Sequence, residues 1–151
     1  MKKLFLYVFL VLMICSVGFA DNLKIIDGDT IILNGEKIRF SGIDAPELKQ
    51  TCIKSGQKVF CGIFSKKLLI KKIGNETPTC IREGKDTYKR ILAECFINGE
   101  SLSSFLVRNG YAFAYRKYSK KFIKDEEFAK MNKLGIWSMK FEYPWNFRKS
   151  S

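Results

Sequence analysis

The sequence contains no histidine, and this absence excludes several kinds of active site. Catalytic triads that use an imidazole and zinc sites with histidine ligands are impossible in this chain of 151 residues. Any catalysis must use carboxylates, arginine, lysine, tyrosine, cysteine or a hard metal ion. Arginine is also scarce, with 6 residues against 21 lysines. Because bidentate phosphate recognition favours arginine over lysine, the few arginines are the more informative basic residues.

Acidic residues are outnumbered by basic ones, 15 to 27, which gives a net charge of +12. Such an excess is typical of nucleic-acid-binding proteins, but a general bias toward lysine would produce the same total. The lysine pairs at 66–67, 71–72 and 120–121 are expected mainly on solvated helix faces, where some could attract a polyanion in a salt-dependent way. With 46% hydrophobic and 28% charged residues, the composition and length are those of one globular domain.

The long apolar run of the sequence lies at its amino end. Two lysines precede an apolar stretch over residues 4–15, and small residues follow up to Ala20. This pattern predicts a signal peptide over residues 1–20, cleaved after Ala20, and a single domain over residues 21–151. The protein is therefore expected to be secreted or periplasmic, with no stable membrane insertion after cleavage. The alternative is an uncleaved anchor, although the run is shorter than the about 20 apolar residues of a membrane helix.

Four cysteines remain once the predicted signal peptide is removed, and an even number in an exported domain indicates two disulfides. Three pairings are possible. We prefer the two local ones, because each joins neighbouring segments of the chain. A zinc site is the alternative, and it is disfavoured because the sequence has neither histidine nor a pair of cysteines separated by two residues. The preferred pairs are Cys52–Cys61 and Cys80–Cys95.

The hydrophobic pattern predicts an α+β domain around a small barrel or sheet. Strands are expected over 23–26 and 31–33, and Asn34-Gly35 predicts a hairpin turn after the second of them. A further strand is expected over 87–96, after a polar turn around Gly84. Apolar residues at helical spacing predict three helices, each ending near a glycine. The apolar residues that mark them begin at Phe60, Leu102 and Phe128, and the glycines that close them are Gly74, Gly110 and Gly135. The aromatic residues Phe113, Trp137, Phe141 and Trp145 are expected in the core.

Two acidic clusters flank the predicted hairpin. The first is Asp27-Gly28-Asp29-Thr30, and the second runs from Gly42 to Glu47 and contains Asp44. A two-residue turn at Asn34-Gly35 places Asp29 opposite Phe40 and Thr30 opposite Arg39. The carboxylates and Arg39 then meet at one end of the sheet. The alternative is that both clusters are ordinary solvated turns.

A hard cation would relieve the repulsion between these carboxylates, and it prefers oxygen ligands. Two carboxylates and one backbone carbonyl do not fill the six to eight positions around such a cation, so water and a substrate phosphate would supply the rest. Such a site predicts a modest affinity, of the order of 10⁻⁴–10⁻³ M.

These clusters and several later stretches resemble the staphylococcal nuclease-like (thermonuclease) family. The similar stretches occur in order between about residues 23 and 148, and they are Ile26–Thr30, Arg39, Gly42–Glu47, Asp86–Ala93, Leu106–Ala112, Ala114–Arg116, Gly135–Trp137 and Pro144-Trp145. The resemblance implies a five-stranded OB-fold-type β-barrel with about three helices. It also implies calcium-dependent cleavage of phosphodiester bonds in DNA and RNA.

The resemblance also implies roles for particular residues. Asp29, Asp44 and the carbonyl of Ala45, where the family often has Thr, resemble the calcium ligands. Glu47 resembles the residue that positions or deprotonates the attacking water, and Arg39 and Arg90 resemble the pair that binds the phosphate. Tyr88 and Tyr115 resemble aromatic residues beside the nucleotide. Lys89 stands where many relatives have glycine.

The leading hypothesis is thus an exported, calcium-dependent nuclease with little sugar specificity, acting on DNA and RNA as a monomer. Replacing Arg39 or Arg90 with alanine is expected to abolish most cleavage and leave the fold intact. One alternative is a non-catalytic OB-type module that binds nucleic acid. That module would have no reason to keep five charged residues together, namely Asp29, Asp44, Glu47, Arg39 and Arg90. A membrane-tethered nuclease is a second alternative, if residues 4–20 stay attached.

Overall fold

The central element is a mixed β-sheet with the strand order β1-β2-β3-β8-β7. The structure is a computed structural model that describes residues 22–150, so the predicted signal peptide lies outside the described residues. β3 and β8 run parallel, and the other pairs of this sheet are antiparallel. The strands are β1 (Leu23–Ile25), β2 (Thr30–Leu33), β3 (Glu36–Phe40), β7 (Thr79–Lys85) and β8 (Ile91–Ile97), with β9 (Glu100–Ser101) beside β8.

The β2–β3 hairpin has the predicted turn and register. Asn34 and Gly35 both have positive φ angles, of 52° and 84°, which suits a tight two-residue turn. Thr30 pairs with Arg39. The N–H of Phe40 donates to the carbonyl oxygen of Asp29 at 2.8 Å. The prediction that this hairpin brings Asp29 and Arg39 to one end of the sheet is confirmed.

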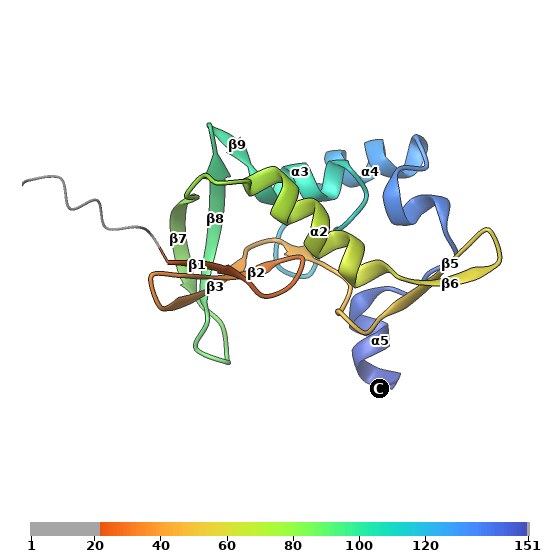
Figure 1. Cartoon of the computed structure of the whole chain (residues 1–151), viewed down its shortest axis with the longest axis horizontal. Helices are drawn as coiled ribbons and strands as arrows, with labels where there is room; N and C mark the ends of the chain where they lie inside the picture. The colour runs from red at the N-terminus through yellow and green to blue at the C-terminus, as the bar shows by residue number, and fades with distance from the viewer. Residues whose placement is uncertain (1–21, 151) are drawn as a thin grey trace, which may run out of the picture.

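Two short antiparallel pairs form separate two-stranded sheets. β4 (Ile43–Asp44) pairs with β10 (Phe113–Ala114), and β5 (Thr51–Lys54) pairs with β6 (Gln57–Phe60). Figure 1 shows α2 (Cys61–Ile73) running from the β5–β6 hairpin back toward the start of β7. The domain is therefore an α+β fold of the OB type, as expected.

The three predicted helices are present, and the described part of the chain contains a fourth. They are α2, α3 (Leu102–Arg108), α4 (Ile123–Met131) and α5 (Pro144–Ser150), with a 3-10 turn over Gly135–Ser138. The prediction that the third helix includes Leu134 is wrong, because α4 ends at Met131. Lys133 adopts φ 51°, and the N–H groups of Lys133 and Leu134 donate back to Lys130 and Ala129. This Schellman motif ends α4 before Leu134, although a lysine stands where glycine is usual.

The predicted strand over 87–96 is wrong at its beginning, because β8 starts only at Ile91. The carboxylate of Asp86 accepts hydrogen bonds from the N–H groups of Tyr88 and Arg90, each at 2.9 Å. These bonds stabilise a turn over 86–90. Gly84 belongs to β7, at an irregularity in the pairing with β8, and not to the turn that was predicted around it.

The core has two parts. The first lies between the main sheet, α2 and α3, and the second lies around the buried ring of Phe113. Trp137, Phe141 and Trp145 pack against the second part, so the expectation that all four aromatic residues belong to the core is confirmed. Among residues 22–150 no helix is long and apolar enough to span a membrane.

Both preferred disulfides are present. Cys80–Cys95 connects opposite residues of β7 and β8, with a Cα–Cα distance of 4.0 Å. Cys52–Cys61 connects β5 to the first residue of α2, with a Cα–Cα distance of 5.7 Å. The second bond therefore ties the β5–β6 hairpin to the helix that follows it.

Candidate active site

Two buried carboxylates lie at the end of the β2–β3 hairpin. Asp29 precedes β2 and is 3% exposed, and Asp44 ends β4 and is 0% exposed. The N–H of Ala45 donates to Asp29 Oδ2 at 2.7 Å, which joins the two acidic clusters directly. The carboxylates that the sequence places on separate segments are therefore neighbours in the structure.

Arg39 lies between these two carboxylates. Its Nη1 donates to Asp29 Oδ1, and its Nη2 donates to Asp44 Oδ1 at 2.7 Å and to the carbonyl oxygen of Ile43 at 3.3 Å. Burial lowers the pKa of Arg39, but the charges of Asp29 and Asp44 outweigh burial and raise it above its ordinary value. Arg39 is thus a permanent counter-ion that the hairpin register places between the two acids.

A second arginine reaches the same carboxylates from the end of the chain. Arg148 lies on α5, and its Nη2 donates to Asp44 Oδ2 at 2.6 Å. Its Nη1 donates to Glu47 Oε1 at 2.8 Å and to Asp44 Oδ1 at 3.2 Å. The sequence analysis did not identify Arg148. The signal that could have drawn attention to it is the scarcity of arginine, because Arg148 is one of only 6.

Burial dominates the electrostatics of the acids. Loss of hydration raises the pKa of Asp44 above its ordinary value, although the hydrogen bond from Arg148 and the charges of both arginines oppose this. Burial and the nearby charge of Asp29 also raise the pKa of Asp27 to about 6. Asp27 belongs to the cluster, because its Oδ1 accepts the N–H of Asp29 at 3.0 Å.

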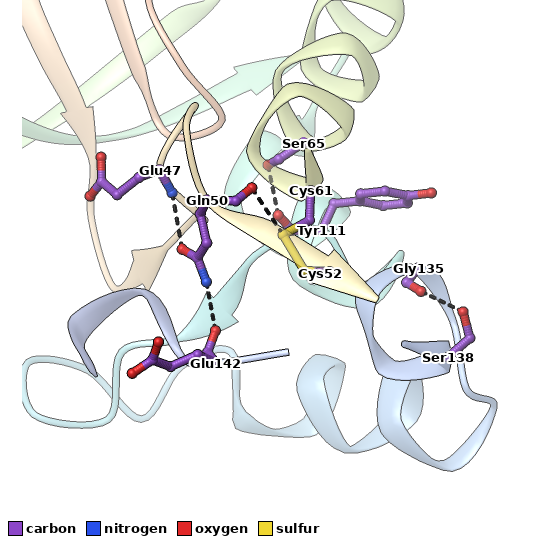
Figure 2. Close-up of a disulfide and its surroundings, with 9 residues drawn as sticks. All are labelled: Glu47, Gln50, Cys52, Cys61, Ser65, Tyr111, Gly135, Ser138 and Glu142. Carbon is purple, nitrogen blue, oxygen red and sulfur yellow. Dashed lines mark hydrogen bonds between the residues drawn. A yellow bond between two sulfur atoms is a disulfide. The ribbon is translucent and has the colours of Figure 1, made fainter. Parts of the chain in front are cut away.

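Glu47 lies at the rim of the cluster, on a loop that a buried glutamine holds. Gln50 is 1% exposed. Its Oε1 accepts the N–H of Glu47 at 3.2 Å and its Nε2 donates to the carbonyl oxygen of Glu142 at 2.6 Å. Figure 2 shows Gln50 between these two segments and beside the Cys52–Cys61 disulfide. Sequence analysis missed Gln50, since nothing in the local pattern marks a glutamine that bonds to a segment 92 residues away.

Two glycines allow the close approach of segments around the acids. A Cβ atom on Gly28 would lie 2.1 Å from Ser65 Oγ and 2.8 Å from the Cβ of Ala45. A Cβ atom on Gly62, in the first turn of α2, would lie 2.0 Å from the carbonyl oxygen of Glu47. Any larger residue at either position must displace a segment that carries an acid.

Arg90 and Tyr88 lie on the turn over 86–90, outside this hydrogen-bonded cluster. Nε of Arg90 donates to Asp86 Oδ2 at 2.6 Å, and the guanidinium lies 5.5 Å from the centre of the Tyr88 ring. Leu92 of β8 is the register partner of Arg39. Arg90 immediately precedes β8, so the turn over 86–90 and not the strand register sets the direction of its side chain.

Tyr115 is held close to the second acidic cluster and stacks on α5. Its N–H donates to the carbonyl oxygen of Gly42 at 2.9 Å. Its ring stacks on Trp145 with a centroid distance of 5.7 Å. These rings line an open hollow of about 700 Å³ whose other side chains include basic and acidic groups. A second hollow of about 440 Å³ adjoins the acids, and it is lined by Asp27, Glu47, Leu48, Lys49, Phe147 and Arg148.

The donor set suits a hard cation, although it is incomplete. In the described part of the chain no group of three or more histidine, cysteine, aspartate or glutamate side chains is arranged to hold a metal ion. Asp29, Asp44 and the carbonyl of Ala45 offer only oxygen atoms, and each carboxylate oxygen can accept more than one partner. Such a set fits Ca²⁺ when water and substrate fill the remaining positions.

The fold and the site define the class: an OB-type α+β domain with buried acids paired to arginines at one end of a β-hairpin. Comparison with known proteins identifies the family. Residues 37–139 match the family described as staphylococcal nuclease homologue. The chain belongs to this family.

Individual relatives are consistent with this assignment. An uncharacterized endonuclease of Haemophilus influenzae is 33% identical over 142 residues, which cover 88% of this chain and 75% of that protein. Endonuclease YncB of Bacillus subtilis is 33% identical over 128 residues, covering 76% of this chain and 59% of that protein. The succinoglycan biosynthesis protein ExoI of Rhizobium meliloti is 32% identical over 124 residues, covering 80% and 65%. The chain thus spans about three fifths to three quarters of the length of these relatives.

Proposed function

We propose that this protein is an exported, calcium-dependent nuclease that hydrolyses phosphodiester bonds of DNA and RNA with little sugar specificity. The observation that carries the proposal is the position of Arg39 between two buried carboxylates, with Glu47 at the rim and an open hollow beside it. Two relatives are named endonucleases. A purely binding module would gain nothing from burying Asp29 and Asp44, because buried carboxylates repel a phosphate backbone.

The side chains divide the work of hydrolysis. Asp29, Asp44 and the carbonyl of Ala45 would hold Ca²⁺, which when bound neutralises charge on the phosphate. Glu47 accepts a proton from the attacking water, whose oxygen forms the new bond to phosphorus. The bond from phosphorus to the leaving oxygen breaks, and that oxygen takes a proton from solvent. Arg39 and Arg90 donate hydrogen bonds to the non-bridging oxygens as negative charge grows on them.

The direct test incubates the purified protein with single-stranded DNA and with RNA of equal length, in calcium and then in excess calcium chelator. We expect both polymers to be cleaved at comparable rates in calcium and to stay intact in chelator. Glu47→Gln is the matched control, because it keeps the shape of the side chain and removes the base. Intact polymers in every tube would favour the non-catalytic module, and equal cleavage with chelator would indicate a mechanism without calcium.

Export and oligomeric state have their own tests. Mass spectrometry of the protein from the culture medium or periplasm is expected to give an amino terminus at Asp21, as cleavage after Ala20 requires. Protein that keeps residues 1–20 and is found in a membrane fraction would support the tethered form. Light scattering is expected to give the mass of a monomer.

A further inference from the structure

Arg148 binds the oxygen atom of Asp44 that Arg39 does not bind. Asp44 Oδ2 accepts from Arg148 Nη2 at 2.6 Å, while Asp44 Oδ1 accepts from Arg39 at 2.7 Å and from Arg148 Nη1 at 3.2 Å. The same guanidinium holds Glu47 Oε1 at 2.8 Å. One side chain of α5 therefore covers both a proposed cation ligand and the proposed base.

Arg39 and Arg148 differ in how easily each side chain can move away from Asp44. The side chain of Arg39 is 14% exposed and is also bound to the carbonyl oxygen of Ile43. The side chain of Arg148 is 39% exposed and lines the open hollow of about 440 Å³. A positive ion that approaches Asp44 repels both guanidiniums, and Arg148 is the one that is more exposed and faces a hollow.

The helix that carries Arg148 need not move with it. Pro144 at the start of α5 is buried, and Trp145 stacks on Tyr115 and on Tyr143, with centroid distances of 5.7 and 4.6 Å. These contacts anchor the first turn of α5 to the second part of the core. An exchange at Asp44 thus requires only a rotation of the Arg148 side chain.

We propose that Arg148 is a resident counter-ion that Ca²⁺ displaces from Asp44. This inference rests on the cation site of the proposed function. In the absence of calcium, Arg148 compensates the buried charge of Asp44 and holds Glu47 near it. When the cation binds, the guanidinium leaves Asp44 and moves into the hollow. The ion pair competes with the cation, so it sets the calcium concentration at which the site fills.

Calorimetric titration with calcium alone, without any nucleic acid, tests this exchange. We expect R148Q to bind calcium at least about fivefold more tightly than the unaltered protein. This factor corresponds to the free energy of a partly exposed ion pair that calcium no longer has to break. K149Q is the matched control, because Lys149 is the exposed neighbour of Arg148 on α5 and carries the same charge. Its affinity is expected to change by less than about twofold, as for a screened surface charge. R148K keeps the charge but loses the bidentate contact, and its calcium affinity is expected to lie between those of R148Q and the unaltered protein.

A second measurement needs no catalysis and would reveal a folding defect in the variants. Chemical denaturation without calcium is expected to show R148Q less stable than K149Q, because Asp44 loses one of its two counter-ions. Saturating calcium is expected to reduce that difference. R148K serves the same purpose if R148Q does not fold.

The outcomes separate the two proposals. If neither the unaltered protein nor any variant binds calcium, then the cation site of the proposed function is wrong, and the exchange is wrong with it. If the unaltered protein binds calcium and D44N does not, the cation site stands. In that case equal affinities for R148Q and K149Q would overturn the exchange alone.

Discussion

At the scale of single residues, Arg39 is the counter-ion of both buried acids, so its removal affects stability as well as activity. The expectation that Arg39→Ala leaves the fold intact does not suit this geometry, because Asp29 and Asp44 are 3% and 0% exposed. Breaking a buried pair by removing one partner costs about 3–5 kcal/mol. Arg90 differs, since its partner Asp86 lies on a partly exposed turn.

We therefore predict that Arg39→Ala lowers the free energy of unfolding by about 3 kcal/mol or more, while Arg90→Ala lowers it by about 1 kcal/mol or less. Both variants are expected to lose about 10²–10³-fold in cleavage rate, as for a lost transition-state donor. Urea denaturation and single-turnover cleavage measure the two effects separately. Equal stability losses would contradict the assignment of Arg39 as the shared counter-ion.

Gly62 is a second residue whose role depends on close packing. In an ordinary helix, replacing glycine with alanine stabilises by roughly 0.5–1 kcal/mol. At Gly62 the new Cβ would lie 2.0 Å from the carbonyl oxygen of Glu47, and overpacking of this kind costs about 1–3 kcal/mol.

We predict that Gly62→Ala destabilises the protein and also slows cleavage, because the displaced loop carries Glu47. Thermal unfolding and cleavage assays would measure both changes. Lys67→Ala is the control, since Lys67 is exposed on the same helix. A stabilised Gly62→Ala protein with full activity would show that the loop tolerates the added methyl group.

At the scale of structural elements, the turn over 86–90 positions Arg90 through one carboxylate. Partial burial tends to raise the pKa of Asp86, but the side-chain and backbone hydrogen bonds from Arg90 outweigh it and hold the pKa below its ordinary value of 3.8. A lowered pKa means that folding stabilises the charged form of Asp86 relative to its protonated form. The stabilisation is therefore complete above pH 3.8 and is lost as the pH falls through the lower, folded value.

We predict that Asp86→Asn is less stable than the unaltered protein at neutral pH, by about 1 kcal/mol or less. The difference is expected to close as the pH is lowered well below 3.8, because Asp86 is then protonated in both states. Denaturation of the two proteins at several pH values measures this gap. A gap that stays constant into strong acid would show that the charge of Asp86 does not stabilise the turn.

The same turn has a consequence for Lys89, which adopts φ 62°. A left-handed backbone is unfavourable for lysine and costs roughly 1–2 kcal/mol relative to the right-handed region. Asp86 offsets this cost, because its side chain and carbonyl oxygen accept three backbone N–H groups of the turn. The lysine is thus accommodated at this position without loss of the turn.

At the scale of the whole molecule, the parts that could be predicted are those with local signals. The hairpin follows from Asn34-Gly35 and strand alternation, and it brings Asp29 and Arg39 together as expected. Contacts between distant segments have no such signal. Arg148 binds Asp44 across 104 residues, and Gln50 binds a carbonyl oxygen across 92. The 86–90 turn was missed for another reason: its cap is a carboxylate, and Gly84 nearby offered a more familiar sign of a turn.

The two disulfides also act at this scale, because they stabilise different parts of the molecule. Cys80–Cys95 lies in β7 and β8 against the main core, whereas Cys52–Cys61 ties the segment after Gln50 to the first turn of α2, where Gly62 contacts Glu47. Loops of these lengths give roughly 3 kcal/mol each in the chain-entropy model.

We predict that replacing either cysteine pair with serine lowers the free energy of unfolding by a similar amount, about 2–4 kcal/mol. Their effects on activity should differ. Well below the melting temperature, Cys80→Ser/Cys95→Ser is expected to cleave at nearly the normal rate, because the acids keep their positions. Cys52→Ser/Cys61→Ser is expected to be slower even when fully folded, since the loop that carries Glu47 loses a covalent support. Cleavage rates measured on fully folded samples decide this, and equal rates for both pairs would mean that Gln50 and Gly62 position Glu47 without help from the disulfide.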